Sequence, residues 1–299
     1  MIIPPKLTQG ATVAIISTAR KITKKELRPA LDLLSEWGLN VVLGKTIGAA
    51  CDQFAGDDSL RTEDLQQMLD NPQIKAVWFA RGGYGTVRII DSIDFSAFKK
   101  TPKWLIGYSD ITVLHSHIHN LGIETLHAQM PLEIEKRSAE SASSIQEVLF
   151  GKEYTIKFSS ESVSGNRNGT AKGQLIGGNL SILYSLCGSN SSLPTDGKIL
   201  FLEDLDEYLY HIDRMLQNLK RNGMLKGLAG LIVGGMSDMS DNTIPFGKTT
   251  KEIIMETVSA YDYPVCFDFP AGHVKDNRAL IMGRTVLFSV DNNKVQLKF

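Results

Sequence analysis

Ser109 is a residue whose type and position suit a nucleophile. It directly follows the apolar run WLIGY and precedes DITVLHSHIHNLG, which has a helical pattern, so we expect it at a strand-to-helix corner. Such a corner lifts a serine hydroxyl out of the backbone, and it aims the N–H group of Asp110 into the same space as the positive end of the helix. The competing interpretation is that Ser109 only caps the helix, because serine is a preferred N-cap residue.

A carboxylate and a histidine that could activate this hydroxyl lie far along the chain. Glu203 ends the apolar run ILFL, and a carboxylate at the end of a buried strand is costly unless it has a partner. His273 lies in the loop sequence FPAGHVKDN after the strand-like run VCFDF, where it is a candidate general base. A serine, a glutamate and a histidine of this kind could together perform acyl transfer.

A glycine-rich segment could supply an oxyanion donor. The sequence RGGYG, residues 81–85, follows the run AVWFA and opens the next helical segment, where glycine lets the backbone approach a ligand closely. A dinucleotide-binding fingerprint fails here, because counting from Gly83 its last glycine position is occupied by Arg88. A tight turn selected only for its backbone angles explains the segment equally well.

The sequence predicts neither a metal site nor a cofactor. The acidic run EDLDE, residues 203–207, could ligate a hard cation, but the start of a charged helix also explains its later members. His115 and His119 are four residues apart and could share a helix face, yet the pattern lacks the glutamate of H-E-x-x-H. We interpret these histidines as surface or packing residues.

The first half of the chain alternates β-rich runs with helical patterns, which is typical of a mostly parallel sheet flanked by helices. Strands are expected at ATVAIIS, NVVLG, AVWFA and KWLIGY, and helices at residues 24–37, SLRTEDLQQMLD, TVRIIDSI and the segment after Ser109. Gly38 stands where the first helix should stop.

The polar, glycine-rich stretch SSESVSGNRNGTAKG is the clearest break in the pattern. We therefore expect an N-terminal domain at residues 1–155, a linker at 156–173 and a C-terminal domain at 174–299. Within the C-terminal part, strands are expected at KILFLE and LAGLIVGG, and helices at GGNLSILYSL, YLYHIDRMLQNLKRNG and residues 250–260. The final TVLFSVDNNKVQLKF is typical of two strands joined by an Asn-Asn turn.

Composition and charge exclude several classes of protein. With 42% hydrophobic and 22% charged residues, the chain is typical of a globular protein rather than a disordered one. A net charge of -1 gives no field that would gather nucleic acid or an anionic membrane. The start lacks a secretory signal, no apolar run reaches bilayer length, and the three scattered cysteines suit reduced, buried thiols. We expect a cytoplasmic protein.

Six blocks follow one another in a defined order: AGDDSLRTEDLQQML, RGGYG, GYSD, GGNLSIL, FLEDLDEYLYHIDRML and PAGH. In this order they resemble the LD-carboxypeptidase family, the murein tetrapeptide carboxypeptidases of peptidoglycan recycling, over nearly the whole chain. The resemblance implies that Ser109 is the nucleophile, that His273 is the general base and that Glu203 orients this base. It also implies an oxyanion hole made of the backbone amides of Gly83 and Asp110.

The resemblance further implies the fold, the substrate and the assembly. The expected fold class is α/β, with an N-terminal mostly parallel sheet flanked by helices and a smaller, β-rich C-terminal α/β domain carrying Glu203 and His273. The substrate would be the amide bond to the terminal D-alanine of murein tetrapeptide, and the chain would form a homodimer without metal or cofactor. The sequence departs from the family pattern at Tyr208, Leu209 and Met282, where proline is common, and these departures concern loop shape and substrate preference.

Three other functions are compatible with parts of this pattern. A microcin-C-immunity-type hydrolase of peptidyl or aminoacyl nucleotides would use the same triad, but no aromatic-bearing insertion that could stack on a base follows Asp110. A non-catalytic two-domain protein that closes on a small ligand is a second alternative. An ordinary α/β-hydrolase esterase is disfavoured, because Ile111 replaces the last glycine of G-x-S-x-G.

Overall fold

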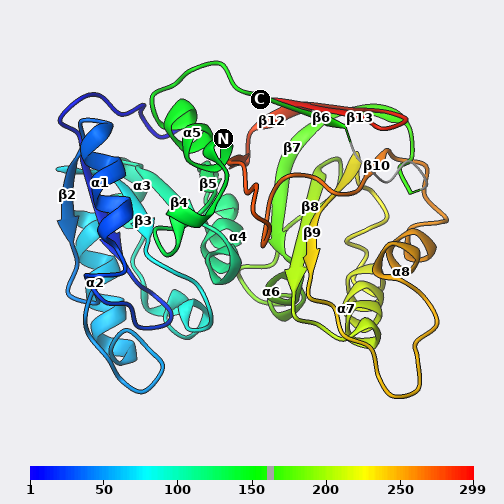
Figure 1. Cartoon of the computed structure of the whole chain (residues 1–299), viewed down its shortest axis with the longest axis horizontal. Helices are drawn as coiled ribbons and strands as arrows, with labels where there is room; N and C mark the ends of the chain where they lie inside the picture. Colours follow the sequence, from blue (N-terminus) through cyan, green and yellow to red (C-terminus); the bar gives the residue numbers. More distant parts are fainter. Residues whose placement is uncertain (160–164) are drawn as a thin grey trace. The chain divides into compact units, whose positions relative to one another are not determined.

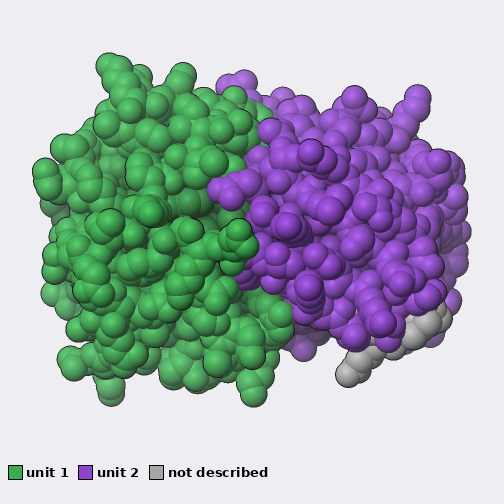
Figure 2. Space-filling view, turned by 90° about the horizontal axis from the view of Figure 1, so that it is seen from above, with its two compact units in different colours: residues 1–153, 275–281 green, residues 154–274, 282–299 purple. Residues whose placement is uncertain are grey.

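The computed structural model describes residues 1–159 and 165–299, and it divides the chain into two compact units. Unit 1 comprises residues 1–153 and 275–281, and unit 2 comprises residues 154–274 and 282–299 (Figure 2). Each unit has its own sheet with helices beside it (Figure 1). The α/β class predicted from the sequence is confirmed.

Unit 1 contains a six-stranded sheet in the order β11-β5-β4-β3-β1-β2 (Figure 1). Its strands are β1 (Thr12–Ile16), β2 (Asn40–Leu43), β3 (Ile74–Phe79), β4 (Trp104–Gly107), β5 (Thr125–His127) and β11 (Leu280–Met282). The pairings among β1 to β5 are parallel, as predicted. Because parallel strands end at the same edge, the segments that follow β1, β3 and β4 meet there.

The helices of unit 1 follow the predicted pattern with local differences. They are α1 (Arg28–Glu36), α2 (Asp58–Asp70), α3 (Ser96–Lys100), α4 (Thr112–Asn120) and α5 (Ala139–Leu149), with 3-10 helices η1 (Thr86–Arg88), η2 (Ile90–Ser92), η3 (Ser109–Ile111) and η4 (Ile134–Lys136). α1 begins later than predicted because Pro29 occupies its first turn, and the chain leaves the helix at Gly38, where φ is 71°. The predicted helix TVRIIDSI is instead the two short 3-10 helices η1 and η2.

Unit 2 contains a seven-stranded sheet in the order β10-β9-β8-β7-β12-β13-β6 (Figure 1). Its strands are β6 (Thr155–Ser159), β7 (Gly169–Asn179), β8 (Ile199–Leu205), β9 (Gly230–Ser237), β10 (Val265–Cys266), β12 (Thr285–Asp291) and β13 (Lys294–Lys298). The half from β7 to β10 is parallel, and the half from β7 to β6 is antiparallel. β12 and β13 flank the predicted Asn-Asn turn, where Asn292 has a φ of 55°.

The helices of unit 2 are α6 (Leu180–Ser185), α7 (Leu209–Arg221) and α8 (Thr250–Thr257). α7 buries one apolar stripe, made of Ile212, Met215, Leu216 and Leu219. This stripe packs into the cluster of buried side chains that includes Leu200 of β8 and Leu231 of β9. A capping box between Thr249 and Glu252 begins α8.

The predicted linker, residues 156–173, has a different structure in its described part. Residues 160–164 lie outside the described residues, β6 covers the beginning of the segment, and β7 begins at Gly169. The sequence is polar there because exposed and buried positions alternate along these antiparallel strands. The polar composition of this segment therefore reflects strands with one solvent-exposed face, and not a linker.

Two further observations bear on the sequence predictions. None of the described helices combines the length and apolar character needed to cross a bilayer. Cys266 is buried as predicted, whereas Cys51 is exposed and Cys187 is partly exposed. The prediction of buried thiols is therefore wrong for Cys51.

Leu200→Ala tests the core of unit 2. Leu200 is fully buried between the sheet and its helices, so we expect this substitution to lower the free energy of unfolding by about 2–5 kcal/mol. Denaturant unfolding followed by circular dichroism measures the change. Leu287→Ala is the matched control, because Leu287 is 46% exposed on β12 and its loss should cost less than about 1 kcal/mol. Equal costs for the two variants would contradict this description of the core.

Candidate active site

Ser109 lies at the turn between β4 and α4 and has an unusual backbone. Its φ is 62°, which places a non-glycine residue in the left-handed region at a cost of about 1–2 kcal/mol. Ser109 is the first residue of η3, whose N-cap is Tyr108, and the N-cap of α4 is Ile111. The N-cap interpretation of Ser109 is therefore wrong, and the strained strand-to-helix turn has the backbone character of a nucleophile elbow.

The glycine loop, residues 81–85, approaches Ser109 closely. A Cβ atom built at Gly82 would lie 3.0 Å from Ser109 Cβ and 3.1 Å from Ser109 Oγ. Gly83, with a φ of 118°, is the next residue, and a Cβ atom there would meet the side chain of Arg20. Sequence reasoning selected Gly83 and missed Gly82, although the glycine pair itself was a signal for both.

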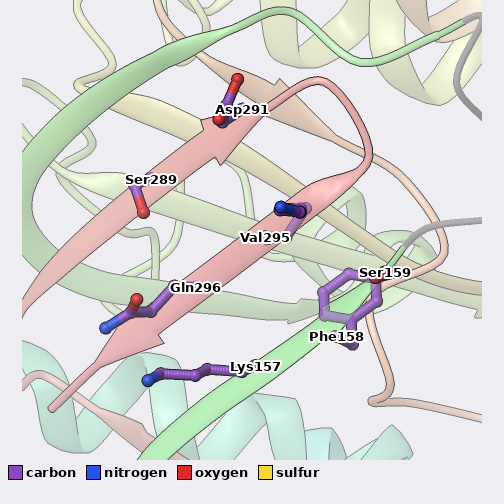
Figure 3. Close-up of a pocket in the computed structure, with 8 residues that line it drawn as sticks. Lys157, Phe158, Ser159, Ser289, Asp291, Val295 and Gln296 are labelled. Carbon is purple, nitrogen blue, oxygen red and sulfur yellow. The ribbon is translucent and has the colours of Figure 1, made fainter.

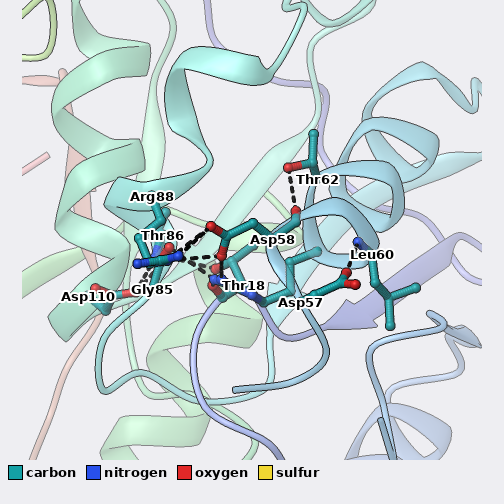
Figure 4. Close-up of polar contacts among 10 residues, drawn as sticks. Thr18, Asp57, Asp58, Leu60, Thr62, Gly85, Thr86, Arg88 and Asp110 are labelled. Atoms are coloured by element: carbon teal, nitrogen blue, oxygen red, sulfur yellow. Dashed lines mark hydrogen bonds and ion pairs between the residues drawn. The ribbon is translucent and has the colours of Figure 1, made fainter. Parts of the chain in front are cut away.

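The carboxylate of Asp110 ties the glycine loop to the corner that holds Ser109 (Figure 4). It is buried, and its Oδ2 accepts hydrogen bonds from the Thr86 N–H group at 2.9 Å and from the Thr86 hydroxyl at 2.6 Å. Since this uses the single hydroxyl proton of Thr86, the Thr18 hydroxyl donates to Thr86 Oγ1 at 2.7 Å. Burial raises the pKa of Asp110, and the bonds from Thr86 oppose that rise.

Arg61 of α2 also holds this loop by hydrogen bonds. Its buried Nη1 donates to the carbonyl oxygens of Thr18 at 2.6 Å and Gly85 at 3.0 Å, which joins the segments after β1 and β3. Arg61 pairs with Asp58, and Asp58 also pairs with Arg88. Burial lowers the pKa of Arg61, and the negative charge of Asp58 opposes this shift. No sequence signal identified this group, because its members come from separate elements.

Glu203 and His273, 70 residues apart, meet in unit 2. His273 Nδ1 lies 2.6 Å from Glu203 Oε2, which also accepts the backbone N–H group of His273 at 3.1 Å. The Glu203 side chain is fully buried, and the His273 side chain is 14% exposed. A carboxylate acceptor favours the tautomer with the proton on Nδ1, so Nε2 is the ring nitrogen that can take up a proton.

Glycines make this pairing possible. A Cβ atom at Gly272, where φ is 99°, would lie 2.7 Å from both Cβ and Oε2 of Glu203. On the other side, a Cβ atom at Gly235 of β9 would lie 2.5 Å from Cγ1 of Val274. The Ser237 hydroxyl then donates to the carbonyl oxygen of His273 at 2.8 Å, which fixes the loop on the end of β9.

Asp204, next to Glu203, is a structural carboxylate. Its Oδ1 accepts hydrogen bonds from the Asn179 side chain and the Leu205 N–H group, and its Oδ2 accepts one from the Ser181 N–H group. Burial, and then the charge of Glu203, raise the pKa of Asp204 to about 7. It holds the start of α6 against the end of β8.

The other candidate ligands do not form a metal centre. In the described part of the chain, no group of three or more His, Cys, Asp or Glu side chains is arranged to hold a metal ion. His115 is buried, with Nδ1 2.7 Å from Thr125 Oγ1 and Nε2 2.9 Å from the carbonyl oxygen of Gly107. Burial lowers the pKa of His115 to about 4, so it is a neutral packing residue. Glu207 lies against His211 at 2.5 Å.

A surface hollow of about 520 Å³ lies on the antiparallel half of the unit 2 sheet, away from this chemistry (Figure 3). Its lining contains neither Glu203 nor His273, and it consists of Lys157, Phe158, Ser159, Ser289, Asp291, Lys294, Val295 and Gln296. Ser109 instead follows β4, Glu203 lies in the last residues of β8, and His273 lies in the loop after β10, near the carboxyl ends of parallel strands, where α/β sheets build their sites.

The strain at Ser109 can be measured by comparing two substitutions. Because glycine tolerates a positive φ, Ser109→Gly should be more stable than Ser109→Ala by about 1 kcal/mol. Ser143, exposed in the middle of α5, is the matched control, and there glycine should be less stable than alanine by about 1 kcal/mol. Denaturant unfolding gives both differences. The same order of stability at both positions would contradict a strained Ser109.

The raised pKa of Asp204 predicts a pH-dependent stability. The group keeps its proton in the folded state up to about pH 7, whereas the unfolded chain releases it near the ordinary value of 3.8. Its contribution to stability is therefore lost as pH rises from about 4 to about 7. Asp204→Asn cannot ionise, so its stability relative to wild type should increase by on the order of 3 kcal/mol over this range.

Urea unfolding of both proteins across this pH range tests the Asp204 prediction. If the side-chain amide introduced by Asp204→Asn fails to make a hydrogen bond, the free energy of unfolding changes by the same amount at every pH. The test is therefore how the difference in this free energy between the two proteins changes with pH. A difference between the two proteins that does not change with pH would show that Asp204 titrates normally.

The chain matches two domain descriptions of one family. Residues 13–128 match the LD-carboxypeptidase N-terminal domain, and residues 172–287 match the LD-carboxypeptidase C-terminal domain. A probable murein peptide carboxypeptidase of Bacillus subtilis is 36% identical over 288 residues, which cover 94% of this chain and 89% of that protein. A murein tetrapeptide carboxypeptidase of Pseudomonas aeruginosa is 31% identical, with 92% of each chain covered.

Solved structures agree with these sequence matches. A muramoyltetrapeptide carboxypeptidase from Oxalobacter formigenes superimposes with a TM-score of 0.86 at 28% identity, covering 96% of this chain and 97% of that one. A more distant relative, the microcin C7 self-immunity protein of Escherichia coli, is 25% identical and covers 97% of this chain and 94% of its own length. The chain therefore belongs to the LD-carboxypeptidase family, a family of serine peptidases.

Proposed function

We propose that the protein hydrolyses the amide bond to the terminal D-alanine of murein tetrapeptide through Ser109, His273 and Glu203. The hydrogen bond of 2.6 Å between His273 Nδ1 and Glu203 Oε2 carries this proposal. A buried carboxylate that holds one ring nitrogen of a partly exposed histidine is the arrangement that prepares the other nitrogen to act as a base. The names of the relatives from Bacillus and Pseudomonas support the substrate.

The chemistry is acyl transfer to serine followed by hydrolysis. Ser109 Oγ attacks the carbonyl carbon while His273 Nε2 takes its proton, and Glu203 stabilises the imidazolium that forms. The tetrahedral intermediate collapses, the C–N bond breaks, and the imidazolium returns the proton to the amine of the departing D-alanine. Water then attacks the acyl-enzyme with His273 again as the base, which releases the shortened peptide and restores Ser109.

We assign the oxyanion hole to the backbone N–H groups of Gly83 and Asp110. Asp110 follows Ser109 in η3, and the contact between Gly82 and Ser109 brings the glycine loop to the same corner. By comparison with other hydrolases, each such donor lowers the barrier by about 3 kcal/mol. The hydrogen bonds between Asp110 and Thr86 hold the glycine loop against the turn that carries Ser109.

The proposal includes a cytoplasmic homodimer, on the strength of the family resemblance, and requires neither metal nor cofactor. It also favours the peptide over the nucleotide conjugates that a microcin-immunity hydrolase would cleave. Three relatives that are 31–36% identical to this chain have names that refer to murein peptides or carboxypeptidases.

Mass-spectrometric detection of D-alanine released from murein tetrapeptide tests the proposal. Ser109→Ala should reduce the rate by about 1,000-fold or more, because it removes the nucleophile. Ser143→Ala, at an exposed helix position, should retain the wild-type rate. A chelator should leave the rate unchanged, since no step uses a metal.

Two outcomes would overturn the proposal. If Ser109→Ala releases D-alanine as fast as wild type, Ser109 is not the nucleophile. If wild type ignores the tetrapeptide but hydrolyses an aminoacyl sulfamoyl nucleoside, the microcin-immunity alternative is correct and the substrate is wrong.

A further inference from the structure

A carboxypeptidase must distinguish a terminal carboxylate from the interior of a peptide. This question rests on the function proposed above, because only that function brings a carboxylate next to Ser109. A guanidinium group is well suited to the task, since its donors match the two oxygens of a carboxylate. Such a group would have to lie near the glycine loop and Ser109.

Arg20 lies beside the glycine loop in unit 1. It lies in the segment after β1, where the Ser17 hydroxyl donates to its carbonyl oxygen at 2.7 Å and a β-bridge joins it to Phe54. Its side chain extends across Gly83, because a Cβ atom built there would lie 2.6 Å from Arg20 Cδ and 2.8 Å from both Cγ and Nε.

The contacts form a short series that ends at the nucleophile. Arg20 covers Gly83, Gly83 is bonded to Gly82, and Gly82 lies against the side chain of Ser109. The positive φ of Gly83 and its lack of a side chain allow the arginine to lie directly on the backbone of the loop. A substituent larger than hydrogen at residue 83 would push Arg20 away.

The guanidinium of Arg20 is available to a ligand, because Arg20 is an exposed residue. Within residues 1–159 and 165–299, its guanidinium takes part in no ion pair and no hydrogen bond, whereas Arg61 and Arg88 both pair with Asp58. Arg81 donates to the carbonyl oxygen of Lys21 at 3.1 Å. Burial, followed by the charge of Arg20, lowers the pKa of Arg81, and the charges of Glu26 and Glu133 oppose this shift.

We propose that Arg20 binds the terminal carboxylate of the substrate and thereby restricts cleavage to the last residue of the peptide. The guanidinium acts as a specificity-determining group: it holds the departing amino acid while Ser109 attacks the bond before it. Nothing in the sequence pattern indicated this role, because an isolated arginine after a strand is common on protein surfaces.

The test compares murein tetrapeptide with the same peptide ending in a carboxamide, which removes the negative charge and leaves the scissile bond intact. Wild type should prefer the acid in kcat/KM, and Arg20→Met should lose about 30- to 100-fold on the acid while changing by less than about 3-fold on the amide. The kcat/KM of Arg20→Lys on the acid should lie between those of wild type and Arg20→Met, because lysine keeps the charge and loses the paired donors.

Arg28→Met is the matched control, because Arg28 is an exposed arginine of the same unit that pairs with Asp32 on α1. It should retain the wild-type preference for the acid. Equal losses on both peptides for Arg20→Met, or no loss on either, would overturn the assignment.

A binding measurement separates this proposal from the proposed function. Calorimetric titration of Ser109→Ala with each peptide should show tighter binding of the acid, and adding Arg20→Met should abolish that difference. If wild type cleaves neither peptide, the proposed function fails, and this titration still decides the role of Arg20. Unchanged discrimination in the double variant would show that another group binds the carboxylate.

Discussion

The fully buried carboxylate of Glu203 imposes the strictest constraint on unit 2. A charged oxygen without solvent needs hydrogen-bond donors, and His273 supplies two of them, from its ring and from its backbone. That double contact requires the loop to lie directly on the glutamate side chain, which is possible only because residue 272 is glycine. The end of β9 must then accept the loop closely, and Gly235 makes room for it. The backbone of the His273 loop and of the end of β9 therefore adopts a conformation that allows close contact with the Glu203 side chain.

A different constraint governs unit 1, where the strain lies in the backbone. Ser109 adopts a left-handed conformation that would relax if its neighbours allowed it. Asp110, Thr86 and Arg61 connect the surrounding segments through buried hydrogen bonds, and these bonds extend from the end of β1 to the glycine loop. Because the carboxyl ends of parallel strands share one edge, a few polar side chains are enough to join all three segments. A rigid support of this kind offsets the strain at the corner.

The two units are not formed by two continuous stretches of the chain. Residues 275–281 belong to unit 1, and β11 completes its sheet beside β5, although the segments before and after it belong to unit 2. The loop that carries His273 therefore ends where the chain leaves unit 2. The sequence did not predict that residues 275–281 rejoin unit 1. β11 has only three residues and therefore no recognisable periodicity, and its partner β5 lies more than 150 residues away.

The sequence alone determined the α/β class, the order of most strands and helices in the first half, and the identity of Ser109, Glu203 and His273 as candidates. These features are local: an apolar run, a helical spacing or a polar residue at the end of a strand can be recognised in a short window. Only the tertiary structure decided that Glu203 bonds to His273, that Asp110 reaches back to Thr86, and that Arg20 lies across Gly83. Such contacts join residues from separate elements, and their geometry depends on how strands pair and where glycine lets the backbone approach.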